Sequence, residues 1–155
     1  MRAPDFARSR KGLFWRSGYT GCMSILSIAT SGLQAASLRL QVSASNIANM
    51  SDTGPLPDAP NAGAFPPAYA PQRVDQVDVA GGGTAASVGT VSPSYVSQYD
   101  PSAPYADQNG LVAAPNVDLT NEVVQQITAR IEFAANARVI KVESEMMKTL
   151  LDIKV

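Results

Sequence analysis

The 155-residue sequence has no histidine and one cysteine, Cys22. It therefore cannot supply a Ser-His-Asp triad, a Cys-His dyad, a zinc site of cysteine and histidine ligands, or a disulfide within the chain. Asp100 and Asp107 could be imagined as paired acids, but their loop-rich surroundings offer no pocket that would hold a catalytic pair. We expect no enzyme activity, no catalytic residue, no cofactor and no metal site.

Charge and long hydrophobic runs are also scarce. The net charge is −1 and 16% of the residues are charged, which argues against nucleic acid as a partner. No apolar run reaches the roughly 20 residues of a bilayer-spanning helix, so we expect a chain that does not span a membrane. Hydrophobic residues make up 45% of the chain but aromatics only 6%, a mixture that suits slender helices better than a bulky core.

Residues 1–22 form a basic stretch with a net charge of +4 and no helical or strand periodicity. Its short apolar run, Leu13-Phe14-Trp15, falls below the roughly 7 residues that a secretory signal requires. Met23 stands where this stretch ends and a regular apolar pattern begins. Two interpretations stay open: translation starts at Met23, or residues 1–22 are a genuine basic arm that contacts a membrane surface or an acidic partner.

A first long helix is predicted for residues 23–50, which contain no proline and one glycine, Gly32. Its apolar residues form two rows with a seven-residue repeat, as in a coiled coil. The rows are Leu26, Leu33, Leu40 and Ile47, and Ala29, Ala36, Ser43 and Met50. Gln34, Arg39 and Gln41 lie on the polar face. The helix would be about 40 Å long and cannot bury its stripe alone.

A second long helix is predicted for residues 118–155, which contain neither glycine nor proline, with Asp118 as its N-cap. Its apolar residues recur every three or four positions, over a predicted length of about 50 Å. They are Val124, Ile127, Ile131, Ala135, Val139, Val142, Met146, Leu150 and Ile153. The opposite face carries charged residues, including Glu122, Arg130 and Glu132.

Residues 51–117 hold ten of the eleven prolines and seven of the eleven glycines, with a net charge of −5. Long helices are excluded there. Short strands are predicted for residues 72–79 and 86–91, joined by a turn at Gly81-Gly82-Gly83, with a third strand at residues 95–99. We expect a small hairpin or three-stranded element that must pack against the rest of the chain.

The fold class is therefore mainly α with a small β insert. The simplest arrangement pairs the two terminal helices as an antiparallel coiled coil. Both seams are rich in Ala and Ser, which bury little area, so the pair should be marginal alone and further copies or subunits would cover the remaining apolar surface. Packing within one chain is the other explanation of a heptad stripe, and periodicity alone does not decide between them.

Several segments resemble the bacterial flagellar rod and hook family. The first helix closes with Ser43-Ala44-Ser45-Asn46-Ile47-Ala48-Asn49, and Thr53-Gly54-Pro55 follows, similar to proximal-rod members. Residues 99–110 and Pro115-Asn116-Val117-Asp118 resemble the segment that re-enters the terminal helix. The family's terminal-helix motif is resembled by Phe133-Ala134-Ala135-Asn136-Ala137-Arg138-Val139-Ile140 and Met146-Met147-Lys148-Thr149-Leu150. The departures are Phe133-Ala134-Ala135 in place of Tyr-Gln-Ala, a longer stretch around residues 59–71, and the basic residues before Met23.

This resemblance implies a structural subunit of the proximal flagellar rod, the periplasmic drive shaft that transmits torque. The implied partners are other rod subunits, the membrane ring and rod adaptor, further copies in a helical assembly, and the flagellar type III export apparatus. The alternative is a secreted coiled-coil module of a related type III secretion system. A small hydrolase acting through the acidic middle segment is disfavoured.

We expect the assembly interface to lie on the two helices. Its candidate residues are Leu26, Leu33, Leu40, Asn46, Ile47, Asn49, Ile127, Ile131, Ala135, Val139, Val142, Met146 and Leu150. Asn49 is interpreted as a helix C-cap, whereas Asn46 is either a cap or a polar residue that fixes the register between subunits. Asp107-Gln108-Asn109-Gly110 has too few carboxylates for a calcium loop and predicts a turn.

Overall fold

The computed structural model describes residues 25–153, so the expectations for residues 1–22 lie outside the described residues. Along the chain, the helix α1 (Ile25–Ala48) precedes four strands and the helix α2 (Leu119–Asp152) follows them. The strands are β1 (Gln72–Asp78), β2 (Thr84–Thr90), β3 (Tyr95–Tyr99) and β4 (Leu111–Pro115). The Asp118 side chain accepts hydrogen bonds from the backbone amides of Thr120 and Asn121, which confirms it as the N-cap of α2.

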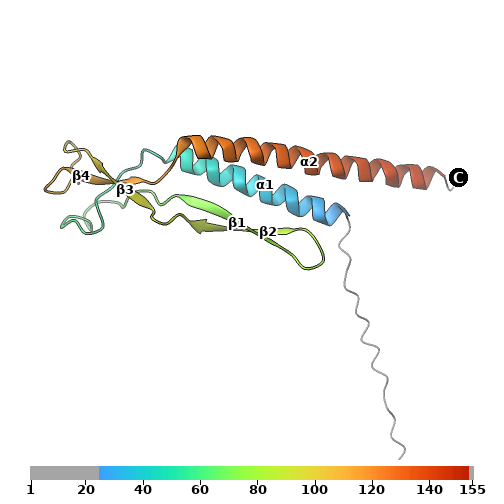
Figure 1. Cartoon of the computed structure of the whole chain (residues 1–155), viewed down its shortest axis with the longest axis horizontal. Helices are drawn as coiled ribbons and strands as arrows, with labels where there is room; N and C mark the ends of the chain where they lie inside the picture. Colours follow the sequence, from blue (N-terminus) through green and yellow to red (C-terminus); the bar gives the residue numbers. More distant parts are fainter. Residues whose placement is uncertain (1–24, 154–155) are drawn as a thin grey trace, which may run out of the picture.

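The two helices lie side by side and antiparallel, and α2 runs on past the start of α1 (Figure 1). Small residues form the contact between them: Ala29, Ala36 and Ala129 are each at most 3% exposed. The Asn136 side chain of α2 packs directly against Gly32, where a Cβ would lie 2.6 Å from its side-chain amide nitrogen. The seam therefore gains close approach but little buried apolar area.

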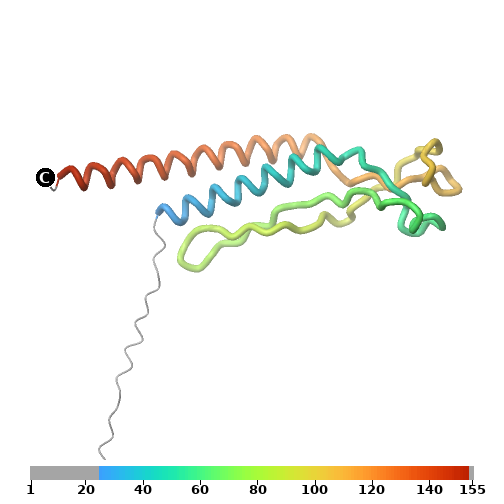
Figure 2. The backbone as a smooth tube through the Cα atoms, turned by 180° about the vertical axis from the view of Figure 1, so that it is seen from behind, coloured from blue at the N-terminus to red at the C-terminus, as the bar shows by residue number. Residues whose placement is uncertain are grey.

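The β1–β2 hairpin lies along α1 (Figure 2). The strands pair antiparallel from Gln72 opposite Thr90 to Asp78 opposite Thr84, which confirms the predicted hairpin, although β2 spans residues 84–90 where the sequence predicts 86–91. Gly81, Gly82 and Gly83 have φ between 89° and 107°, which glycine adopts without steric cost. The turn is fixed to α1, because the Thr84 amide donates to the Ser31 hydroxyl at 3.1 Å.

The second strand pair, β3–β4, lies at the far end of the molecule with the proline-rich loops (Figure 1). Its inner residues Val112, Ala113 and Ala114 are buried. Gly54 forms a bridge to Ala113 on the β4 edge, with two backbone hydrogen bonds of 2.9 and 3.0 Å. Gly54 belongs to the Thr53-Gly54-Pro55 motif, which therefore anchors the exit of α1 to this sheet.

The two long helices and the small β insert confirm the coarse fold prediction. The third predicted strand exists as β3, but it pairs with β4 instead of joining the hairpin. β4 is missing from the sequence prediction because its two alanines and terminal proline carry little strand propensity. Its pairing partner and Gly54 supply the hydrogen bonds that its own residue types do not suggest.

Candidate assembly interface

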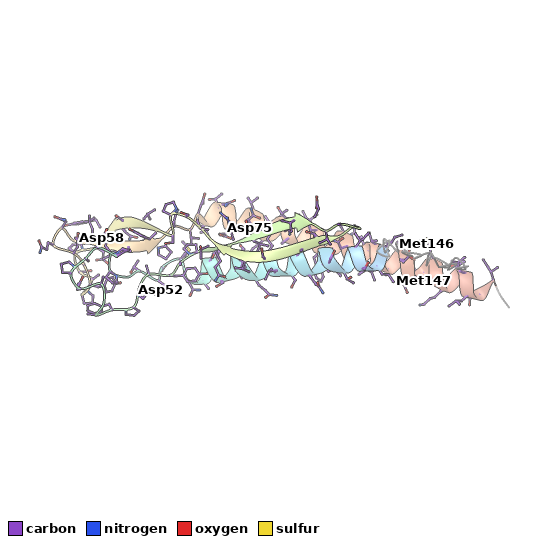
Figure 3. The ribbon with its side chains drawn as sticks, turned by 90° about the horizontal axis from the view of Figure 1, so that it is seen from below. Asp52, Asp58, Asp75, Met146 and Met147 are labelled. Carbon is purple, nitrogen blue, oxygen red and sulfur yellow. The ribbon has the colours of Figure 1, made fainter. Side chains whose placement is uncertain are left out.

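The apolar row predicted on α2 is exposed and lies outside the buried α1–α2 contact. Ile127, Ile131 and Leu150 are 53%, 64% and 68% exposed. The other members of the row are also exposed: Val124, Ala135, Val139, Val142, Met146 and Ile153. We call these nine residues the α2 stripe. Figure 3 shows the end of this helix, where Met146 and Met147 lie beyond the hairpin.

The face of α2 that contacts α1 carries polar residues beside Ala129, whereas the antiparallel coiled coil expected from the sequence would place the apolar row there. Arg39 donates to both carboxylate oxygens of Glu132 at 2.7 and 2.8 Å. The Ser43 hydroxyl donates to the backbone oxygen of Glu122 at 2.9 Å. Glu122, Ala129, Glu132 and Asn136 recur at helical spacing, but polar residue types hide this second stripe from a search for apolar periodicity.

The predicted rows on α1 divide between two surroundings. Ala29, Ala36 and Ser43 are buried, whereas Leu26, Leu33 and Ile47 are half-buried and Leu40 is exposed. Leu40 and Phe133 line a groove of about 250 Å³ together with Ala36, Ser37, Ala129 and Arg130. The groove continues along α1 past Leu33. One heptad row thus packs within the chain and the other borders an open apolar groove.

Asn46 is 1% exposed and is bonded entirely within the chain. Its side-chain nitrogen donates to the Gln72 backbone oxygen and to Glu122 Oε1, both at 2.7 Å. Its side-chain oxygen accepts from the Gln72 amide at 2.9 Å and from the Tyr69 hydroxyl at 3.0 Å. The residue therefore joins α1, β1 and α2, which neither interpretation from sequence foresaw.

Asn49 and Asp107 have local roles. The Asn49 side-chain amide donates to the Ser45 carbonyl at 2.9 Å, as a residue at a helix C-terminus does. The Leu111 amide donates to the Asp107 carboxylate, and with a bond from Asn109 this holds the pKa of Asp107 below its ordinary value. The predicted turn is present, and it loses this stabilisation as the pH falls through the lowered pKa.

The described residues contain no cluster of His, Cys, Asp or Glu that could hold a metal ion. Figure 3 shows Asp52 and Asp58 in the loop end and Asp75 on the hairpin, so these acids are spread along the molecule. Neither described helix is sufficiently long and apolar to cross a bilayer. The notable surface features of residues 25–153 are therefore the α2 stripe and the groove beside it.

Known protein families match the sequence of both helical segments. A family model described as flagella basal body rod protein matches residues 26–55. Another, described as flagellar basal body rod FlgEFG protein C-terminal, matches residues 108–153. The flagellar basal-body rod protein FlgC of Salmonella typhimurium is 41% identical over 134 residues, which cover 83% of this chain and 95% of that protein. The chain belongs to the FlgC family.

More distant FlgC proteins match over the same extent. The protein of Agrobacterium fabrum is 31% identical and covers 81% of this chain and 90% of its own length. The protein of Borreliella burgdorferi is 32% identical over 153 residues, which cover 86% of this chain and 97% of that protein. The two family models together match the α1 segment with Thr53-Gly54-Pro55 and nearly all of α2.

Proposed function

We propose that the chain polymerises with other rod proteins into the shaft that transmits torque through the periplasm. Membership in the FlgC family makes it a structural subunit of the flagellar basal-body rod. The observation that carries the proposal is the α2 stripe: residues such as Ile131 and Leu150 are more than 60% exposed on a helix whose other face is already covered. Such a surface is stabilised by burial against neighbouring subunits.

The coiled-coil packing expected from the heptads is proposed to form between subunits. Within the chain the α1–α2 contact is made by alanines, a serine and a salt bridge, which leaves the larger apolar side chains for neighbours. The terminal segments 23–50 and 118–155 would form the assembly core and residues 51–117 its outer part. Leu26, Leu33, Leu40, Ile47 and the α2 stripe would make direct contacts, whereas buried Asn46 would act by holding the helices in place.

Further partners follow from the same proposal. Assembly at the base of a rod brings the chain beside the membrane ring and rod adaptor as well as other rod subunits. Delivery through the flagellar export apparatus requires passage in an unfolded form, and the small α1–α2 seam is compatible with easy unfolding. These partners are proposed from family membership and from the exposed helix faces together.

Mass spectrometry of hook–basal bodies tests the proposal. Particles purified from cells that express the chain should contain its peptides from both helices, in a constant ratio to other rod proteins. Two other fractions serve as controls: purified filaments and the hook-length-control protein. Both should lack the peptides of this chain. If well-sampled basal bodies contain no such peptides while the culture medium does, the rod assignment fails and the secreted coiled-coil module becomes the better explanation.

A further inference from the structure

The groove between the helices is open, apolar and built on small residues. Ala36 and Ala129 form its floor and are each 1% exposed, while Leu40 and Phe133 stand at its sides. It lies away from the hairpin, because the hairpin contacts Ile28 and Ser31, which occupy a different face of α1 from Leu33, Ser37 and Leu40. Nothing within residues 25–153 covers it.

A groove with alanines at its base and larger side chains along its sides can accept a side chain from a neighbouring helix. The α2 stripe carries suitable side chains on a different face of the same helix. Near its C-terminal end Val139, Val142 and Met146 line a shallow apolar surface beside Ile25. Groove and stripe therefore point away from each other, so one copy can use both at the same time.

Three charged groups beside these surfaces have no ion pair among the described residues. Arg130 lines the groove, whereas Arg138 and Glu143 border the Val139–Met146 surface, where Glu143 is the one anion. The ion pairs of residues 25–153 are instead Arg39–Glu132, Arg73–Asp75 and Lys141–Glu145. Arg130 and Glu143 are about 20 Å apart along a helix that rises 1.5 Å per residue, so they cannot meet within one chain.

We propose that the Val139 and Val142 side chains of one copy insert into the Leu40–Phe133 groove of a second copy, where Glu143 pairs with Arg130. This inference rests on the proposed function and specifies the partner and the register of that assembly. Because the two surfaces differ, the contact is heterologous and leaves one groove and one stripe free at the ends. Repetition of this contact generates a ring or an open helical array of copies.

Charge reversal tests the register in hook–basal bodies isolated from cells whose only copy of the gene carries the variant. Arg130→Glu and Glu143→Arg should each lower incorporation of the chain at least about fivefold, since like charges are brought together. The double variant should return to within about twofold of the parent. Lys148→Glu, an exposed cation outside the groove, is the matched control and should assemble normally.

Cross-linking identifies the occupant. In a Cys22→Ser background, Arg130→Cys and Glu143→Cys are combined and basal bodies are treated with a bismaleimide. Adducts whose masses are whole multiples of this chain support the proposal. The proposal is overturned if the adducts contain a different rod protein, or if particles that contain the variant give no adducts. It is also overturned if the double charge reversal fails to restore incorporation. Absence of the parent chain from basal bodies would instead reject the proposed function.

Discussion

At the scale of single residues, Asn46 holds three elements of the chain together through its side-chain amide. It is buried and makes four hydrogen bonds that join α1 to β1 and α2. Removing its amide would leave Glu122 and the Gln72 backbone without these partners. An unsatisfied buried polar group costs about 1–3 kcal/mol, so the loss is large for a chain with so small a core.

We therefore predict that Asn46→Ala raises the hydrogen-exchange rate of the Gln72 amide about fivefold or more, because that amide donates to the Asn46 side chain. Hydrogen exchange followed by mass spectrometry measures it. Asn121→Ala, at an exposed position in the first turn of α2, is the control and should leave that rate unchanged. Equal rates in Asn46→Ala and the parent chain would contradict the role assigned to this network.

Gly54 gives a second test at this scale, because its side-chain position is occupied by backbone atoms. A Cβ there would meet the backbone nitrogen of Ala68 and lie 2.7 Å from the carbonyl carbon of Pro67. Gly54→Ala should destabilise the β3–β4 end by about 1–3 kcal/mol, as overpacking does, and raise its rate of proteolysis at least about fivefold. Gly63→Ala, with nothing within 4 Å, should not. Equal proteolysis of the two variants would rule out this close contact.

At the scale of elements, the α2 stripe separates the stability of the chain from its assembly. Ile131 is 64% exposed, so Ile131→Asp should leave the far-UV ellipticity of the dilute free chain unchanged. The same variant should fail to enter basal bodies, because it places a charge in the proposed apolar contact between subunits. Far-UV circular dichroism and quantification in basal bodies provide the two measurements.

Ser144→Asp introduces the same charge at an exposed position of α2 outside the stripe and should behave like the parent in both measurements. If Ile131→Asp abolishes the helicity of the dilute free chain, the stripe packs within the chain after all. If it assembles normally, the stripe is not the interface.

The elements themselves follow well from sequence, because each carries a local signal. Freedom from proline, the Asp118 cap and the triple glycine mark both helices and the hairpin. The orientation of α2 does not follow in this way. Apolar periodicity identifies the α2 stripe, but it cannot say that this stripe stays exposed while Glu122, Glu132 and Asn136 face α1. That choice depends on tertiary contacts, such as the close approach at Gly32, that no local pattern encodes.

At the scale of the whole molecule, the seam between the long helices is too slight to hold them firmly in a free chain. Its buried hydrophobic contacts are Ala29, Ala36 and Ala129, and the segment of α2 beyond α1 has no neighbour among the described residues. Apolar burial contributes about 25 cal/mol per Å², so alanine methyl groups supply little of the free energy needed to order two such helices.

The free chain should therefore show weak helicity that is lost gradually on heating, with helicity rising at higher protein concentration as stripes and grooves become occupied. Circular dichroism melts over a wide range of concentrations, together with the molecular mass in solution, provide the measurement. A sharp, concentration-independent melt of a monomer would mean that the α1–α2 pair is stable by itself. The exposed stripe would then be a permanent feature of a folded subunit, and assembly would not be what orders the helices.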